Sequence, residues 1–131
     1  MNGCDQDRPI QSFMDLRVWK EGMDLVEACY LLSSSFPKDE MYGLTAQLRR
    51  AAVSVPANIA KGYGRESMGS YVHHLRIAQG SLRELQTHVL LAERIKITTA
   101  QAAAPVLVRC ETVAKMLNGL IRSLNKYESK T

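Results

Sequence analysis

The sequence predicts an all-α protein, an antiparallel up-and-down four-helix bundle. Apolar residues recur at spacings of three and four in four successive segments, which is the pattern of amphipathic helices. Breaks rich in Ser, Pro and Gly separate the segments, and no strand-like alternation competes with this reading. The chain has 131 residues, 46% of them apolar, which suits one domain with a sizeable core. Four helices with short connections pack most simply as an antiparallel bundle.

The first helix is expected over residues 15–34, and two apolar strips run side by side along it. The first strip is Leu16, Trp19, Met23, Val26 and Tyr30, and the second strip is Val18, Leu25, Cys29 and Leu32. The serines at 33–35 and Pro37 end this helix. Serine favours local backbone hydrogen bonds over helix, and a residue that precedes proline avoids the helical conformation.

The second helix is expected over residues 44–63, after a break at Gly43 and a new N-cap at Thr45. Its apolar stripe is Leu44, Leu48, Ala52, Val55 and Ile59. Pro56 lies inside this pattern, where it removes a backbone donor and crowds the carbonyl of Ala52, so we expect a kink there. The alternative is a true break into two shorter helices. The segment 62–64, Gly-Tyr-Gly, closes the helix because glycine tolerates a left-handed C-terminal conformation.

The third and fourth helices are expected over residues 67–95 and 100–127, and both show a strict four-three alternation. The apolar stripe that results, here called the seam, consists in the third helix of Tyr71, Leu75, Ala78, Leu82, Leu85, Val89 and Ala92. In the fourth helix the seam is Val106, Cys110, Val113, Leu117, Leu120, Leu124 and Tyr127. Residues 97–99 supply N-cap candidates between the two helices, and Pro105 suits a first helical turn.

Three glycines, Gly22, Gly80 and Gly119, fall inside predicted helices. Each costs about 1 kcal/mol relative to alanine. A close helix-helix contact would compensate for this cost, and a purely tolerated glycine is the alternative at any one of them.

The expected domain organisation is a flexible N-terminal segment at 1–12, the four-helix bundle at 13–127 and a frayed polar tail at 128–131. The first residues lack the apolar core of a secretory signal, and no run approaches the length of a membrane-spanning helix. The three cysteines, Cys4, Cys29 and Cys110, are odd in number and widely spaced, as is typical of reduced thiols. We therefore expect a cytoplasmic protein with no membrane partner.

Catalytic or cofactor chemistry is not predicted. The glycines at 62, 64 and 69 lack the preceding strand and the Gly-Lys-Ser/Thr of a phosphate loop. His73 and His74 are adjacent and point about 100° apart on a helix. Glu84 and His88 share a face, but two ligands do not make a zinc site. The expectation is a non-enzyme with no catalytic residues, no cofactor, no metal and no small-molecule substrate.

Positive charge is concentrated in the middle of the chain. Residues 44–95 carry seven basic and three acidic residues, and these account for the whole net charge of +4. Flanks of the second and third helices carry the candidates for nucleic-acid binding, which are Arg50, Lys61, Arg65, Arg76 and Arg83. Two interpretations stay open here. In the first, these flanks are ordinary helix faces exposed to solvent. In the second, they form a surface whose arginine guanidinium groups bind phosphate oxygens.

Three segments carry a family resemblance: DLRVWK at 15–20, GLTAQLRRAAVSVPANIAKGYGR at 43–65 and LRIAQGSLRELQT at 75–87. The chain resembles the bacterial four helix bundle protein family, which includes intervening-sequence proteins encoded inside some large-subunit ribosomal RNA genes. More distantly it is similar to the accessory protein of diversity-generating retroelements, a basic pentameric bundle that binds nucleic acid and a reverse transcriptase. The resemblance implies a compact bundle and a homopentamer. Lys61 stands where the family usually has glutamate, which either strengthens a basic surface or alters an intersubunit salt bridge.

The predicted function is a non-catalytic homo-oligomeric bundle that binds RNA, DNA or a nucleic-acid-associated protein through its basic surface. The alternative is a structural or protein-interaction module with no nucleic-acid role. The sequence itself favours self-association. The core of one chain cannot bury both apolar strips of the first helix and the apolar run at 89–92, so some of these side chains would be exposed in a monomer. The pentamer comes from the resemblance alone.

Overall fold

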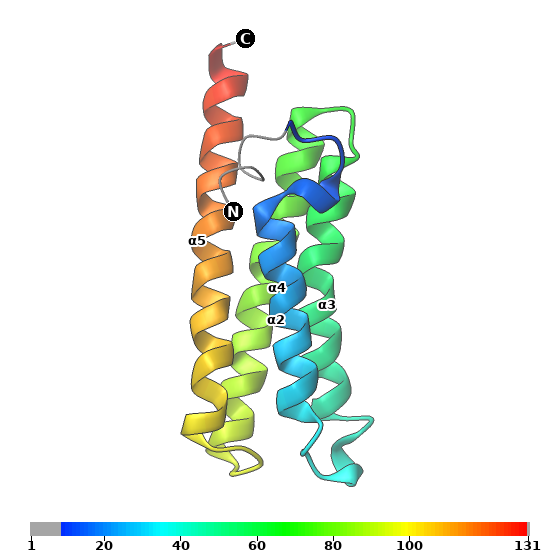
Figure 1. Ribbon diagram of the computed structural model, residues 1–131, viewed down its shortest axis with the longest axis vertical. Helices are drawn as coiled ribbons and strands as arrows, with labels where there is room; N and C mark the ends of the chain where they lie inside the picture. Colours follow the sequence, from blue (N-terminus) through cyan, green and yellow to red (C-terminus); the bar gives the residue numbers. More distant parts are fainter. Residues whose placement is uncertain (1–8, 131) are drawn as a thin grey trace.

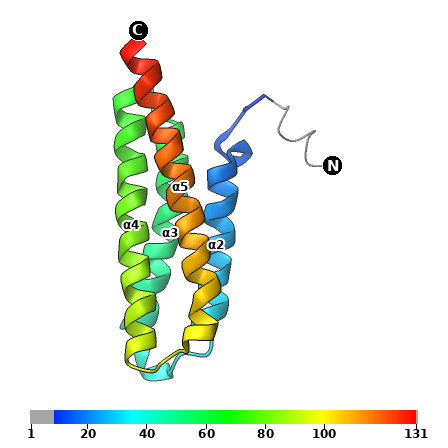
Figure 2. The ribbon, with the colours of Figure 1, turned by 90° about the vertical axis from the view of Figure 1, so that its left-hand side faces the viewer.

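The computed structural model describes residues 9–130 and shows a four-helix bundle, which confirms the predicted fold class. The helices are α2 (Arg17–Ser33), α3 (Leu44–Tyr63), α4 (Met68–Arg94) and α5 (Ala100–Lys130). Two short 3-10 turns, η1 (Phe13–Asp15) and η2 (Lys38–Glu40), precede α2 and α3. The chain runs up and down (Figure 1), and each helix packs against two others, so that α2 lies diagonally opposite α4 (Figure 2).

The core follows the predicted apolar seams closely in α3 and α4. All five stripe residues of α3 are buried, and in α4 every seam residue after Tyr71 is buried. Leu75, Leu82 and Leu85 are shielded almost completely from solvent. The long contact between α3 and α4 therefore forms the centre of the molecule.

In α2, the second strip lies in the core, whereas the first strip lies at its edge, with Leu16, Trp19 and Val26 partly buried against the core. Val18, Leu25, Cys29 and Leu32 are buried, whereas Met23 and Tyr30 of the first strip stay 45% and 44% exposed. Leu90 and Leu91, inside the apolar run at 89–92, are exposed too. These side chains leave a substantial apolar surface on the single chain.

Helix α3 is continuous through Pro56, so the alternative of two shorter helices is wrong. Pro56 is buried against α2 at Gly22, where an added Cβ would lie 3.4 Å from the Cβ of Pro56. Gly22 therefore lies at a helix-helix contact as predicted, although an added Cβ would be in ordinary van der Waals contact there. The same prediction is wrong for Gly80 and Gly119, where no atom beyond the local helix lies within 4 Å of an added Cβ. The kink at Pro56 stays a prediction.

The helix ends differ from the expected ones in detail. Ser12 caps η1, since its hydroxyl accepts from the backbone N of Met14 at 3.2 Å, and α2 begins two residues later than expected. The predicted N-cap at Thr45 is wrong, because Gly43 is the N-cap of α3 and Thr45 lies inside the helix. Thr99 does cap α5 through Ala102 N at 3.1 Å, so Pro105 lies past the first turn.

At the end of α3, the expected left-handed glycine is also wrong. Gly64 has φ −80°, and no described glycine has a positive φ. The left-handed residue is instead Lys96, with φ 66°, just after α4. Gly62 has a different reason to be glycine, because α4 lies very close to it.

The outer segments extend the bundle at both ends. Helix α5 continues to Lys130, past the predicted end at Tyr127. Residues 1–8 of the predicted flexible segment 1–12, and residue 131 of the tail 128–131, lie outside the described residues. The mobility of these two segments stays a prediction.

Candidate nucleic-acid interface

The structure divides the five predicted basic residues between two surfaces. Arg50 and Lys61 line a groove along the outer side of α3, and Arg76 and Arg83 line a second groove between α4 and α5. Arg65 lies in the loop after α3 and borders neither groove. The two grooves share no residue, so the five cations do not form one site within a single chain.

The first surface, the α3 groove, has a volume of about 670 Å³. Its lining residues are Tyr30, Met41, Tyr42, Thr45, Ala46, Arg49, Arg50, Val53, Ser54, Ala57, Asn58 and Lys61. Three of these side chains are cationic and none is acidic. Such a one-sign lining favours anions because no carboxylate within the lining cancels its positive potential.

Arg49 is a fixed cation at the α2 side of the groove. Its Nε donates to Ser33 Oγ at 2.8 Å, and Ser33 Oγ in turn donates to the carbonyl oxygen of Cys29 at 2.8 Å. The Arg49 guanidinium carbon also lies 4.5 Å from the ring centroid of Tyr30, in a cation-π contact. These contacts hold the charge in place beside the groove.

Asn58 is fixed at the α4 side of the same groove. Its amide nitrogen donates to Ser54 O at 2.9 Å and to Ser54 Oγ at 3.0 Å. Ser54 Oγ lies 2.8 Å from Ser81 Oγ of α4, and this pair joins the two helices. The groove therefore has polar groups held in defined positions on both sides.

Two further groove residues are unusual in their surroundings. Tyr42 is 95% exposed, although tyrosine is a large and partly apolar side chain. Thr45 is buried, and among the described residues its hydroxyl is the one buried side-chain polar atom without a hydrogen-bond partner. A buried unpaired hydroxyl costs about 1–3 kcal/mol, which makes it a candidate for contact with a ligand.

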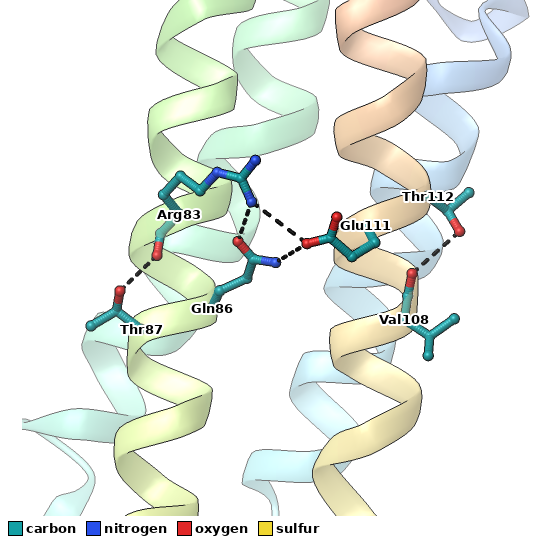
Figure 3. A network of polar contacts seen from close by, with 6 residues as sticks. All are labelled: Arg83, Gln86, Thr87, Val108, Glu111 and Thr112. Atoms are coloured by element: carbon teal, nitrogen blue, oxygen red, sulfur yellow. Dashed lines mark hydrogen bonds and ion pairs between the residues drawn. The ribbon is translucent and has the colours of Figure 1, made fainter.

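In the second groove, Arg83 is tied into a network across α4 and α5 (Figure 3). Its Nη1 donates to Gln86 Oε1 at 2.8 Å, and Gln86 Nε2 donates to Glu111 Oε2 at 2.7 Å. Arg83 Nη1 also lies 3.6 Å from Glu111 Oε2. Because Glu111 offsets its charge, Arg83 is a weaker phosphate ligand than Arg50 or Lys61.

The His, Cys, Asp and Glu side chains bear on metal binding and on nucleophilic chemistry. Across residues 9–130, no three His, Cys, Asp or Glu side chains are placed to hold a metal ion. His88 Nε2 lies 3.4 Å from Glu84 Oε2, as their shared helix face predicts. Burial raises the pKa of Cys29 to about 12, with nearby Cys110 adding to the shift, and burial raises that of Cys110 to about 12. Both thiols are therefore neutral at ordinary pH and poor nucleophiles.

Residues 14–119 match the family described as 23S rRNA-intervening sequence protein. The chain belongs to this family. The match covers all of α2, α3 and α4 and most of α5, so both grooves fall within the family region. None of the helices in residues 9–130 combines the length and the apolarity that a bilayer-crossing segment needs.

One solved structure has a similar fold. It is a protein of unknown function from the S23 ribosomal protein family of Bacteroides thetaiotaomicron, and the sequence identity is 18%. The TM-score is 0.72, and the match covers 79% of this chain and 97% of the other. No curated protein matches the chain.

The sequence alone does not single out three members of the α3 groove: Tyr30, Tyr42 and Thr45. Tyr30 is part of an apolar strip and Thr45 resembles a helix cap. Tyr42 gives the one usable signal, because it is a tyrosine in a short polar turn directly before Gly43. Their grouping with Arg49 and Arg50 becomes visible once α2 is placed against α3.

Proposed function

We propose that this family member is a non-catalytic homo-oligomeric bundle that binds RNA or DNA through the α3 groove. The cationic lining of that groove, without a carboxylate, is the observation that carries the proposal. Arg50 and Lys61 are exposed, and among residues 9–130 neither side chain makes a hydrogen bond or an ion pair, so both are available to phosphate oxygens. The free thiols Cys29 and Cys110 support a cytoplasmic location.

Charge reversal tests the basic surface. Changing Arg50, Lys61, Arg65, Arg76 and Arg83 together to glutamate is expected to abolish binding to mixed RNA and DNA at low salt. Within this set, the pair Arg50→Glu/Lys61→Glu is expected to remove more affinity than Arg76→Glu/Arg83→Glu, because Glu111 already offsets Arg83. Fluorescence anisotropy over a salt series measures both effects, since phosphate contacts make affinity fall as salt rises.

The matched control reverses five other basic residues, so that net charge changes equally. Outside both grooves, a suitable set is Arg17, Lys20, Lys96, Lys115 and Arg122. This control is expected to retain clearly more affinity than the first variant. Absence of binding by the wild type at low salt, or survival of binding in the first variant, would contradict the proposal.

Exposed apolar side chains support the homo-oligomer. Leu31 is 71% exposed and Val108 65% exposed, and Leu90 and Leu91 add to the apolar surface of α4. Val108 lies beside Ala104 and Pro105 in an apolar hollow of about 750 Å³ that also contacts Glu21 of α2. A second copy of the chain would cover surface that soluble monomers rarely expose.

The expected assembly is a homopentamer closed by head-to-tail contacts, with the number five taken from the family resemblance. Native mass spectrometry at micromolar concentration is expected to show a species of five times 14.6 kDa. A persistent monomer would contradict self-association, whereas a clean dimer or tetramer would contradict only the number.

The same apolar surface favours the second candidate function, a structural or protein-interaction module with no nucleic-acid role. The two candidates differ in one measurement. An oligomer that shows no salt-dependent binding to either RNA or DNA supports the interaction module.

A further inference from the structure

We infer that the α3 groove binds a single-stranded segment of RNA or DNA, with one base stacked on Tyr42 and the backbone phosphates on Arg50 and Lys61. This inference rests on the proposed function and specifies its ligand. It makes stacking on an aromatic ring, in addition to charge, part of recognition.

Tyr42 is placed as a stacking platform by a turn with a fixed backbone. Gly43 N donates to Glu40 O at 3.0 Å, and Leu44 N donates to the Glu40 carboxylate at 3.2 Å. The side chain that this turn projects is 95% exposed, so the fold does not use the ring for packing. A base can stack on such a ring in a sequence-tolerant way, because every base has a π-face.

The cations follow Tyr42 along α3, which begins two residues after it, at a spacing that suits a nucleic-acid strand. Arg50 and Lys61 lie eleven residues apart, which is about 16 Å along a helix. At about 3.4 Å per nucleotide of a stacked strand, this distance corresponds to about five nucleotides. Figure 1 shows α3 beside α2, and the groove is lined along α3 by residues from Thr45 to Lys61.

Thr45 provides an independent indication of a ligand at the Tyr42 end. Its buried hydroxyl has no partner within the protein, although it lines the groove next to Arg49. Rotation of the Thr45 side chain toward the groove would pair this hydroxyl with a polar atom of a bound nucleotide. Valine has nearly the same shape without the hydroxyl, so Thr45→Val separates this contact from packing.

A single strand is favoured over a duplex by the ring itself. In a duplex the base faces are covered by their neighbours, whereas an unpaired base exposes its face to an aromatic side chain. Charge alone would not distinguish the two forms in this way, because both carry phosphates. Preference for single strands is therefore the signature of the Tyr42 contact.

The experiment measures the affinity of the full-length protein for ten-nucleotide single-stranded RNA and DNA and for a ten-base-pair duplex, by anisotropy at low salt. Single strands are expected to bind more tightly. Tyr42→Ala is expected to lower their affinity about five- to 150-fold, given the usual strength of base stacking. Tyr42→Phe and the control Tyr127→Ala, an exposed tyrosine of α5, are expected to retain it.

Two further readouts separate stacking from charge and from folding. The double variant Arg50→Gln/Lys61→Gln is expected to reduce the slope of log affinity against log salt by about 1.4, at about 0.7 per phosphate, while Tyr42→Ala leaves the slope unchanged. Thr45→Val is expected to lower affinity several-fold without lowering Tm.

Equal binding of duplex and single strand, together with an unchanged affinity of Tyr42→Ala, would overturn the inference and leave the proposed function standing. Absence of binding to all three probes would overturn both. If Tyr42→Ala changes the oligomer mass in native mass spectrometry but not the affinity, a second copy of the chain occupies the groove and the inference is wrong.

Discussion

Replacing Leu82 with aspartate is expected to unfold the protein, or to lower its free energy of unfolding by more than about 4 kcal/mol. Leu82 is 1% exposed and lies at the middle of the seam of α4. Loss of a buried leucine side chain alone costs about 2–5 kcal/mol. A carboxylate at this place adds the cost of an unpaired buried charge. Since domains of this size are stable by about 5–15 kcal/mol, the sum approaches the whole stability.

Urea and thermal unfolding followed by circular dichroism measure this effect. Gly80→Asp, two residues earlier in the same helix, is the matched control, because Gly80 is exposed and has open space around it. It introduces the same charge and is expected to change stability by less than about 0.5 kcal/mol. An unchanged melting temperature of Leu82→Asp would mean that position 82 faces solvent and that the seam is out of phase.

The seams of α3 and α4 could be predicted from the sequence because one apolar stripe on each helix has no competitor. In α2 the residues left two choices, since both strips are apolar at helical spacing. The structure buries Leu25 and Cys29 and leaves Met23 at the surface. That choice depends on where the other three helices lie, and no local pattern contains this information.

The seam of α5 shows a second limit to prediction from sequence, which comes from helix geometry. A strict repeat of seven drifts by about 20° per heptad on a straight helix of 3.6 residues per turn. Over three heptads the buried face therefore moves toward the following residue. The structure shows this shift, because Ile121 is buried where the repeat predicts Leu120, and Tyr127 at the end of the repeat is exposed.

For the candidate site, the sequence indicated which cations to consider but not how they group. Arg50 and Lys61 lie on one helix, so their common groove is a local consequence of helical spacing. Arg83 faces Glu111 of α5, and this pairing depends on the contact between α4 and α5. Tyr30 and Tyr42 meet the cations through the packing of α2 and η2 beside α3, which likewise follows from tertiary structure.

Replacing Gly62 with alanine is expected to destabilise the bundle by about 1–3 kcal/mol, although alanine is the better helix former by about 1 kcal/mol. An added Cβ at this position would lie 3.0 Å from His74 Cβ, 3.0 Å from Tyr71 Cδ1 and 3.1 Å from the backbone oxygen of Tyr71. The last of these atoms belongs to the backbone of α4 and cannot rotate away. The end of α3 must therefore move from α4, in the turn that follows Lys61.

Gly80→Ala is the control for this effect, because nothing lies within 4 Å of an added Cβ there. It is expected to stabilise the protein by about 0.5–1 kcal/mol, through the loss of glycine's conformational freedom in the unfolded chain. Opposite signs of the two changes in Tm would identify the close approach of α3 and α4 as the reason for Gly62. If Gly62→Ala instead raised Tm as much as Gly80→Ala, α3 and α4 would be able to separate at this point without loss of stability. The end of α3 that carries Lys61 would then not be rigidly placed.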